Sequence, residues 1–144
     1  MSAFADSSAL VKLYADEPDH EAMRALEVIV VSCLARVEVP AAIWRKQRIG
    51  ELGRTDASTL VADFEVDYFG TPDDASRFLV IDVTASLLDL AARLVATRGL
   101  RAYDGIQLAS ACATRDTDPG CDAFACTDVS LRLAAAAEGF TLVP

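Results

Sequence analysis

Short apolar runs alternate along the chain with longer segments whose apolar residues recur every three or four positions. Residues 28–31 form the clearest run, a stretch of Val and Ile typical of a strand buried on both faces. Further strands are predicted at residues 2–5, 78–83, 123–127 and 140–143. This alternation of strands with helices predicts one α/β domain built on a largely parallel sheet.

The predicted helices share one feature, a small polar or acidic residue able to cap the start. They run from the Ser7–Ser8 pair to Tyr14, from Asp19 to Leu26, over residues 34–49, from Thr55 past Phe64, from Thr84 to Gly99, from Asp104 to about Arg115, and from Asp128 to Gly139. In the third helix, Leu34, Val37, Ala41 and Trp44 are predicted to share one side. Pro40 should bend or locally disturb that helix.

Length and composition support a single domain with its own core. The chain has 144 residues, of which 53% are hydrophobic, and a chain of this size buries roughly 70% of its unfolded surface. No apolar run approaches the ~20 residues that a membrane-spanning helix needs, and the N-terminal residues do not resemble a secretory signal. We therefore expect a cytoplasmic protein whose four cysteines are unpaired thiols.

The net charge of −9 argues against binding nucleic acid through a general positive field. Other common chemistries are also weakly supported. His20 is the only histidine, so a Ser/His/Asp hydrolase or a zinc site has little basis, and no glycine-rich nucleotide-binding loop is present.

Four acidic residues form the main candidate site. Asp6 and Asp128 each follow a predicted strand, and Asp104 lies where a loop meets a helix. Helix capping alone explains any one of these aspartates. Glu38 differs, because it lies inside a helix with no basic residue three or four positions away, where an unpaired carboxylate is costly to bury.

The carboxyl ends of parallel strands are where open α/β sheets bind ligands. Asp6, Asp128, Glu38 and Asp104 would form a four-carboxylate pocket there. Mutual repulsion of the carboxylates favours protonation, whereas Mg²⁺ or Mn²⁺, hard ions that take oxygen ligands, favours the charged forms. For Glu38 an arginine partner elsewhere in the fold is an equally open explanation.

The segments around these acids resemble the four motifs of PIN-domain ribonucleases, and most closely those of VapC-type toxins. The matching segments are Asp6-Ser7-Ser8-Ala9-Leu10-Val11-Lys12-Leu13-Tyr14, Ser32-Cys33-Leu34-Ala35-Arg36-Val37-Glu38, Arg101-Ala102-Tyr103-Asp104-Gly105-Ile106-Gln107-Leu108-Ala109, and Thr127-Asp128. They occur in the family's order and extend over nearly the whole chain.

The resemblance implies a three-layer α/β/α fold around a mainly parallel sheet of about five strands. It also implies an endoribonuclease that depends on Mg²⁺ or Mn²⁺, is neutralised by a VapB-type antitoxin, and often forms a homodimer. Asp6, Glu38, Asp104 and Asp128 would hold the metal, with Asp6 and Asp104 as direct ligands. Water would attack the phosphodiester, leaving 5′-phosphate and 3′-hydroxyl ends, and Thr127 would support Asp128 or a metal-bound water.

Two basic clusters are candidates for contact with RNA phosphates. Arg45, Lys46 and Arg48 lie near the end of the Glu38 helix, and Arg98 and Arg101 precede Asp104. An ordinary solvated helix face is the alternative explanation for both clusters. The surface of residues 34–68 is the predicted docking site for an antitoxin segment that places an Arg or Lys in the acidic pocket.

Two other functions remain open. A phosphoacceptor signalling domain would phosphorylate Asp6, but it should have a second acid beside Asp6 and a late lysine, and the only lysines are Lys12 and Lys46. A PIN fold kept as a non-catalytic binding scaffold is expected to have lost one of the acids, and none is missing.

Overall fold

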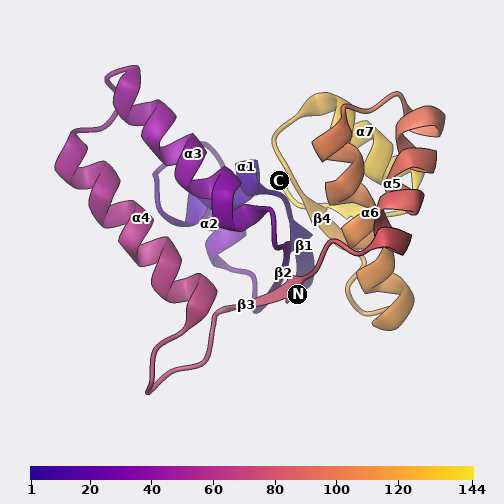
Figure 1. Ribbon diagram of the computed structural model, residues 1–144, viewed down its shortest axis with the longest axis horizontal. Coiled ribbons are helices and arrows are strands. Elements are labelled where there is room, and N and C mark those ends of the chain that lie inside the picture. The colour runs from indigo at the N-terminus through magenta and orange to yellow at the C-terminus, as the bar shows by residue number, and fades with distance from the viewer.

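A sheet of five parallel strands lies at the centre of the protein, with the strand order β3-β2-β1-β4-β5 (Figure 1). The computed structural model describes residues 1–144. The strands are β1 (Ser2–Ala5), β2 (Val28–Ser32), β3 (Phe78–Ile81), β4 (Ala123–Ala125) and β5 (Thr141–Leu142). The chain adds β2 and β3 on one side of β1 and β4 and β5 on the other, so the direction of sheet growth switches beside β1.

Every predicted helix is present. The helices are α1 (Ser7–Leu10), the 3₁₀ helix η1 (Val11–Leu13), α2 (His20–Arg24), α3 (Ala35–Arg48), α4 (Arg54–Phe69), α5 (Ala85–Arg98), α6 (Ala102–Thr117) and α7 (Val129–Ala137). None is long and apolar enough to cross a membrane. The sequence signals at the ends of α5 act as expected, since the Thr84 hydroxyl accepts a hydrogen bond from the Leu87 N–H and Gly99 ends the helix at a positive φ.

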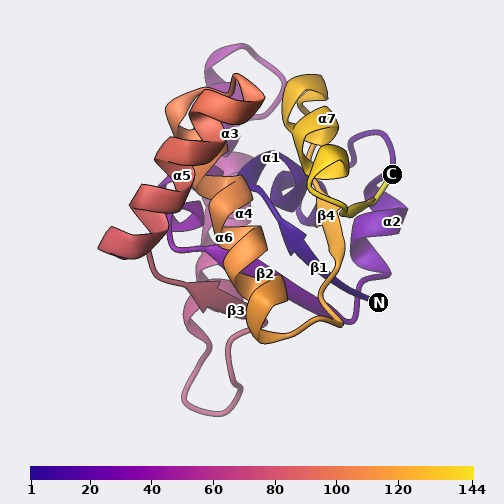
Figure 2. The same cartoon turned by 90° about the vertical axis from the view of Figure 1, so that its right-hand side faces the viewer.

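Two hydrophobic cores lie on opposite faces of the sheet. One packs α1, α3 and α4 against alternate strand residues such as Ala3 and Val31, and the other packs α5, α6 and α7 against the intervening residues such as Phe4 and Val30. Figure 2 shows α5, α6 and α7 in front of the sheet and α3 and α4 behind it. The fold is therefore the expected three-layer α/β/α arrangement.

The predicted apolar side of α3 was wrong. Val37 is 72% exposed, and the buried residues of α3 are Ala35, Val39 and Ile43, which recur every four positions. The helix also continues through Pro40 without a break. Apolar residues occur on more than one side of this helix, so its sequence pattern does not determine which side meets the core.

Some predicted helix starts also differ. Asp6, and not Ser7 or Ser8, caps α1. Helix α6 begins at Ala102, so Asp104 lies in its first turn. Asp19 precedes α2 at a φ of 64° and makes no capping hydrogen bond through its side chain.

Candidate functional site

Asp6 is the most deeply placed of the four acids. It follows β1, and its backbone N–H donates to the Ala125 carbonyl of neighbouring β4 at 3.0 Å. Its Oδ1 accepts hydrogen bonds from Ser8 Oγ at 2.6 Å and from the Ala9 N–H at 3.0 Å. Burial raises the pKa of Asp6 to about 6, the negative charges of Glu38 and Asp104 raise it further, and the two hydrogen bonds partly offset the shift.

Glu38 is held by neutral donors and not by the cation that its sequence context left open. Its Oε1 accepts hydrogen bonds from Ser7 Oγ at 3.1 Å and from Gln107 Nε2 at 2.8 Å. Ser7 belongs to α1 and Gln107 to α6, so the carboxylate of α3 is held between helices from both layers. These two contacts turn Glu38 toward the acids beyond the strand ends.

Asp104 and Asp128 are joined by one guanidinium. Arg101 donates through Nε to Asp104 Oδ2 at 3.0 Å, and its Nη2 lies 3.5 Å from Asp128 Oδ2. The Asp104 hydrogen bond, followed by the charges of Asp104 and Asp128, raises the pKa of Arg101. Asp128 also caps α7, because its Oδ1 accepts from the Leu131 N–H at 2.9 Å. The capping prediction therefore holds for Asp128 without excluding a second role.

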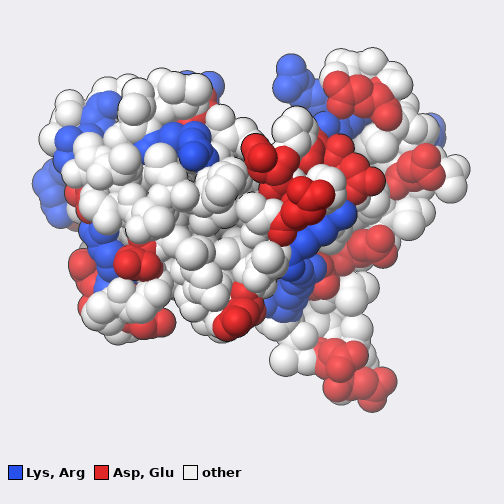
Figure 3. Space-filling view, turned by 180° about the vertical axis from the view of Figure 1, so that it is seen from behind, with Lys and Arg blue, Asp and Glu red and all other residues white.

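Ser8 links the end of β4 to Asp6. Its Oγ accepts from the Thr127 N–H at 3.0 Å and donates to Asp6 Oδ1. Thr127 thus contributes through its backbone, whereas the predicted role of its hydroxyl beside Asp128 stays a prediction. From behind, the surface is notched between two lobes, and acidic side chains gather beside the notch (Figure 3).

The donor set suits a hard divalent cation. The protein's hydrogen bonds use Asp6 Oδ1, Glu38 Oε1 and Asp104 Oδ2, which leaves the second oxygen of each carboxylate without a protein donor. Those second oxygens reach solvent, because Gln107 Oε1 is the one fully buried side-chain N or O that lacks a partner.

The acids are not grouped as a closed metal cage, since no three Asp, Glu, His or Cys side chains are close enough together to form one. This spacing is compatible with Mg²⁺, which keeps several waters and commonly takes only one or two carboxylates directly. The residues present therefore fit such an ion through their chemistry, and direct ligation by all four acids remains a prediction.

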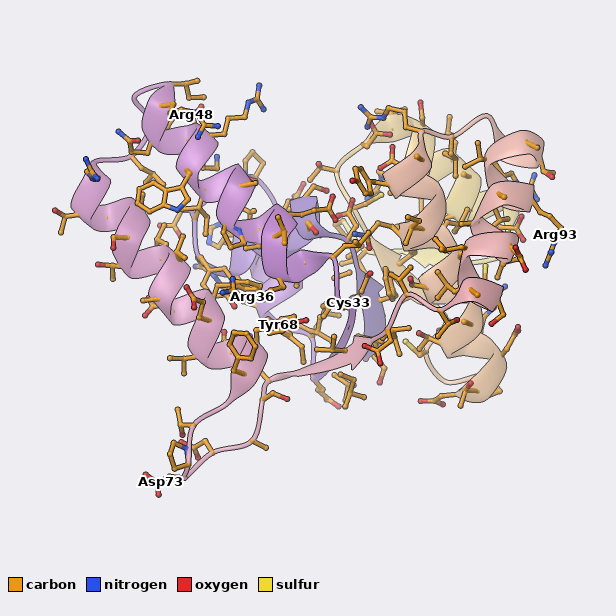
Figure 4. All side chains as sticks on the ribbon, in the orientation of Figure 1. Cys33, Arg36, Arg48, Tyr68, Asp73 and Arg93 are labelled. Carbon is orange, nitrogen blue, oxygen red and sulfur yellow. The ribbon has the colours of Figure 1, made fainter.

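The predicted basic contacts divide into two groups. Lys46 pairs with Glu17 and Glu51, and Arg98 pairs with Glu138, so both cations are already engaged away from the acids. Arg48 lies at the far end of α3 (Figure 4), and Arg45 lines a pocket that also includes Ser8. Arg101 alone among the predicted cations contacts the acids.

Three residues of the site were missed as site residues by the sequence reasoning. Gln107 lies one helical turn after Asp104, a spacing that places both on one face of α6 and that could have identified it. Ser7 and Ser8 were interpreted only as helix caps, although their hydroxyls support Glu38 and Asp6.

A family model for the PIN domain matches residues 3–117 of this sequence. The chain belongs to the PIN-domain family. The matched segment includes Asp6, Glu38 and Asp104 but ends before Asp128, whose place in the site therefore rests on the bridge through Arg101. Among curated proteins, none matches the sequence significantly.

Solved structures of similar fold span this PIN domain almost completely. PAE2754 from Pyrobaculum aerophilum is 22% identical with a TM-score of 0.65, covering 99% of this chain and 90% of that chain. VapC20 of Mycobacterium tuberculosis, described as a sarcin–ricin loop cleaving toxin, is 18% identical with a TM-score of 0.63, covering 99% of both chains. FitAcB from Neisseria gonorrhoeae is 18% identical with a TM-score of 0.61, covering 100% of this chain and 97% of that chain. At these identities the likeness is one of fold.

Proposed function

We propose that this PIN domain is an endoribonuclease that depends on Mg²⁺ or Mn²⁺ and hydrolyses RNA phosphodiesters with water. The observation that carries the proposal is the meeting of Asp6, Glu38 and Asp104 beyond the strand ends, where the charges of the other two raise the pKa of Asp6. Carboxylates that repel one another in this way, each with an oxygen free of protein donors, favour a divalent cation over an empty acidic pocket.

The bound cation supplies an activated water at neutral pH and positive charge for the phosphate under attack. The protein's own residues fix the geometry. Ser8 and the Ala9 N–H hold Asp6, Ser7 and Gln107 hold Glu38, and the capping bond to Leu131 holds Asp128. No histidine takes part in this assignment, since the only histidine, His20, bonds the Glu17 carbonyl in a different region of the chain.

The strong negative charge does not oppose this function once the cations are counted. Two divalent ions would reduce the net charge from −9 to −5 and remove repulsion where the phosphodiester approaches. The remaining attraction must come from local cations, since the protein as a whole stays acidic.

We further propose that the protein is the toxin of a type II toxin–antitoxin pair, acting in the cytoplasm as a homodimer. The fold likeness to VapC20, a toxin by its description, supports this proposal. A VapB-type antitoxin would dock over α3 and α4 and place an Arg or Lys among the acids. The bond of Arg101 to both Asp104 and Asp128 supports it, because it is an example of a guanidinium fitting between these carboxylates.

Incubation of the purified protein with mixed RNA and Mg²⁺ or Mn²⁺ tests the nuclease proposal. Cleavage should require the cation, leave 5′-phosphate ends, and be lost in Asp6→Ala and Asp104→Ala. Asp16→Ala is a matched control, because Asp16 is an exposed acid paired with Arg24 on another part of the surface. Absence of metal-dependent cleavage, or equal cleavage by the Asp6 and Asp104 variants, would contradict the proposal.

Induced expression in cells tests the toxin proposal separately. Growth should stop with the wild-type protein and continue with Asp104→Ala, and co-expression of a small antitoxin encoded beside it should restore growth. Size-exclusion chromatography with light scattering checks the homodimer. Cleavage in vitro without growth arrest would retain the nuclease and reject the toxin.

A further inference from the structure

A second pocket opens beside the acidic site, on the side of β4 and α7. Its volume is about 530 Å³, and its walls include Lys12, Cys126, Thr127 and Arg132. Thr127 also lines the neighbouring pocket that contains Ser8 and Arg45. The two pockets therefore meet next to Asp128, the residue that follows Thr127.

Lys12 is an unusual residue for this position. It is only 7% exposed, and it forms neither an ion pair nor a hydrogen bond with the rest of the protein. Lysine is almost never buried to this extent without a partner, because an unpaired ammonium loses its hydration. Its Nζ still reaches the pocket, since the one fully buried and unpartnered side-chain N or O is Gln107 Oε1.

The other charges of the pocket leave Lys12 without compensation. Arg132 donates to two neutral acceptors, the carbonyls of Cys126 and Val143, so its charge also lacks a carboxylate partner. Glu17, on the opposite wall, is already paired with Lys46. Asp19 lies exposed at the rim. The interior of the pocket therefore presents two cations to an incoming group, which suits an anion.

Connection to the acidic site follows from the local helix. Lys12 comes four residues after Ser8 along α1 and η1, which places the two residues on the same side, one turn apart. Ser8 contacts both Asp6 and the Thr127 N–H. A group bound by Lys12 would thus lie along the surface that continues from the proposed cleavage site.

We propose that Lys12 and Arg132 form a subsite for a backbone phosphate of RNA next to the phosphodiester that is cut. This inference rests on the proposed nuclease function and extends it. It also supplies the local positive charge that the acidic composition otherwise lacks. A phosphodiester is the fitting ligand because Lys recognises phosphate as a point charge and Arg through directed N–H groups.

Salt-dependent RNA binding provides the test. An Asp6→Asn background prevents cleavage, and the affinity for a labelled single-stranded RNA is measured by fluorescence anisotropy from low to high salt. Lys12→Gln should weaken binding roughly tenfold. It should also make the plot of log affinity against log salt shallower by about 0.7, the value for one lost phosphate contact on a single strand. Lys12→Arg should restore the slope.

Arg93→Gln is the matched control, because Arg93 is an exposed cation that points away from the protein on α5 (Figure 4). It changes the net charge equally and should leave the slope unchanged. Thermal melting of Lys12→Gln and Lys12→Met shows whether each variant is folded, and the folded one is used. An unchanged slope for the folded Lys12 variant, or equal effects of the Lys12 and Arg93 variants, would overturn the inference.

Inorganic phosphate distinguishes a free anion from RNA. If phosphate raises the melting temperature of the wild type but not of the Lys12 variant, while RNA binding is unaffected, the subsite takes a free phosphate and the inference is wrong. Metal-dependent cleavage by the wild type with no effect of Lys12 on RNA binding rejects the subsite alone. Absence of both cleavage and RNA binding rejects the proposed function together with the subsite.

Discussion

Asp6 destabilises the fold that positions it. Its side chain is 7% exposed and its pKa is raised to about 6, mainly because burial penalises the charged carboxylate. Above that pH the folded protein must keep a charge that is more stable in the unfolded chain. A group kept against this cost is typical of a functional site, where a bound cation restores the balance.

Asp6→Asn should therefore stabilise the protein in EDTA at pH 7.5, by on the order of 2 kcal/mol. Asn keeps the oxygen that accepts from Ser8 and Ala9 and caps helices as well as Asp. Because the folded pKa is raised, the penalty on the wild type is absent below the unfolded value of about 4 and complete above about 6.

Thermal unfolding from pH 3.5 to pH 8 measures this effect. The difference between Asp6→Asn and the wild type should be small at the acid end and grow between pH 4 and about 6. Asp16→Asn is the control, since its partner Arg24 lowers the pKa of Asp16 and gives no such gain. A gain for Asp6→Asn that is independent of pH would contradict the assigned cause.

Gln107 should matter for metal affinity more than for stability. Its Nε2 holds Glu38, and its Oε1 is buried without a partner, so Gln107→Leu removes one useful contact and one unfavourable group. We expect a near-unchanged melting temperature and a Mn²⁺ requirement for cleavage raised about 10-fold. Ser110→Ala, one turn later on α6, removes a polar group bonded only to the Ile106 carbonyl and should not change the requirement. A large loss of stability in Gln107→Leu would assign it a structural role.

At the scale of elements, the packing of α6 on α5 sets the position of Asp104. Gly105, the next residue, is buried at this contact, and a Cβ there would lie 2.5 Å from Val95 Cγ2 and 3.3 Å from the Ala91 carbonyl oxygen. The first turn of α6 can approach α5 this closely only because Gly105 has no side chain. The helices were predicted from periodicity, but this close approach was not.

Gly105→Ala should displace that first turn despite the better helix propensity of Ala. We expect a loss of about 1 kcal/mol in stability and a larger loss of cleavage, because Asp104 moves with the turn. Adding Val95→Ala removes the nearest clashing atom and should recover most of both losses. Additive effects of the two substitutions in a double-mutant cycle would contradict the contact as the cause.

At the scale of the whole molecule, the sequence predicted the frame of the site better than its contacts. Apolar runs located the five strands, and Asp6 and Asp128 were correctly placed beyond β1 and β4. The contact between Gln107 and Glu38 joins residues 69 positions apart, and a single sequence carries no local signal for such a pair. The buried side of α3 and the enclosure of Lys12 were missed for the same reason, since tertiary packing decides them.

The site takes Glu38 from one helical layer, Asp104 from the other, and Asp6 and Asp128 from the strand ends between them. A divalent cation that joins these carboxylates should therefore stabilise the whole fold and not one helix. The gain follows mass action and is about 2.7 kcal/mol when the ion is at 100 times its dissociation constant. We expect the melting temperature to rise steadily with the logarithm of Mn²⁺ concentration, whereas KCl at equal ionic strength should give a smaller rise from screening alone. Asp104→Asn should remove most of the Mn²⁺ effect, and Asp89→Asn, an exposed acid on α5, should leave it intact. Equal responses of these two variants would mean that the ion acts on the net charge of −9 and not on this site.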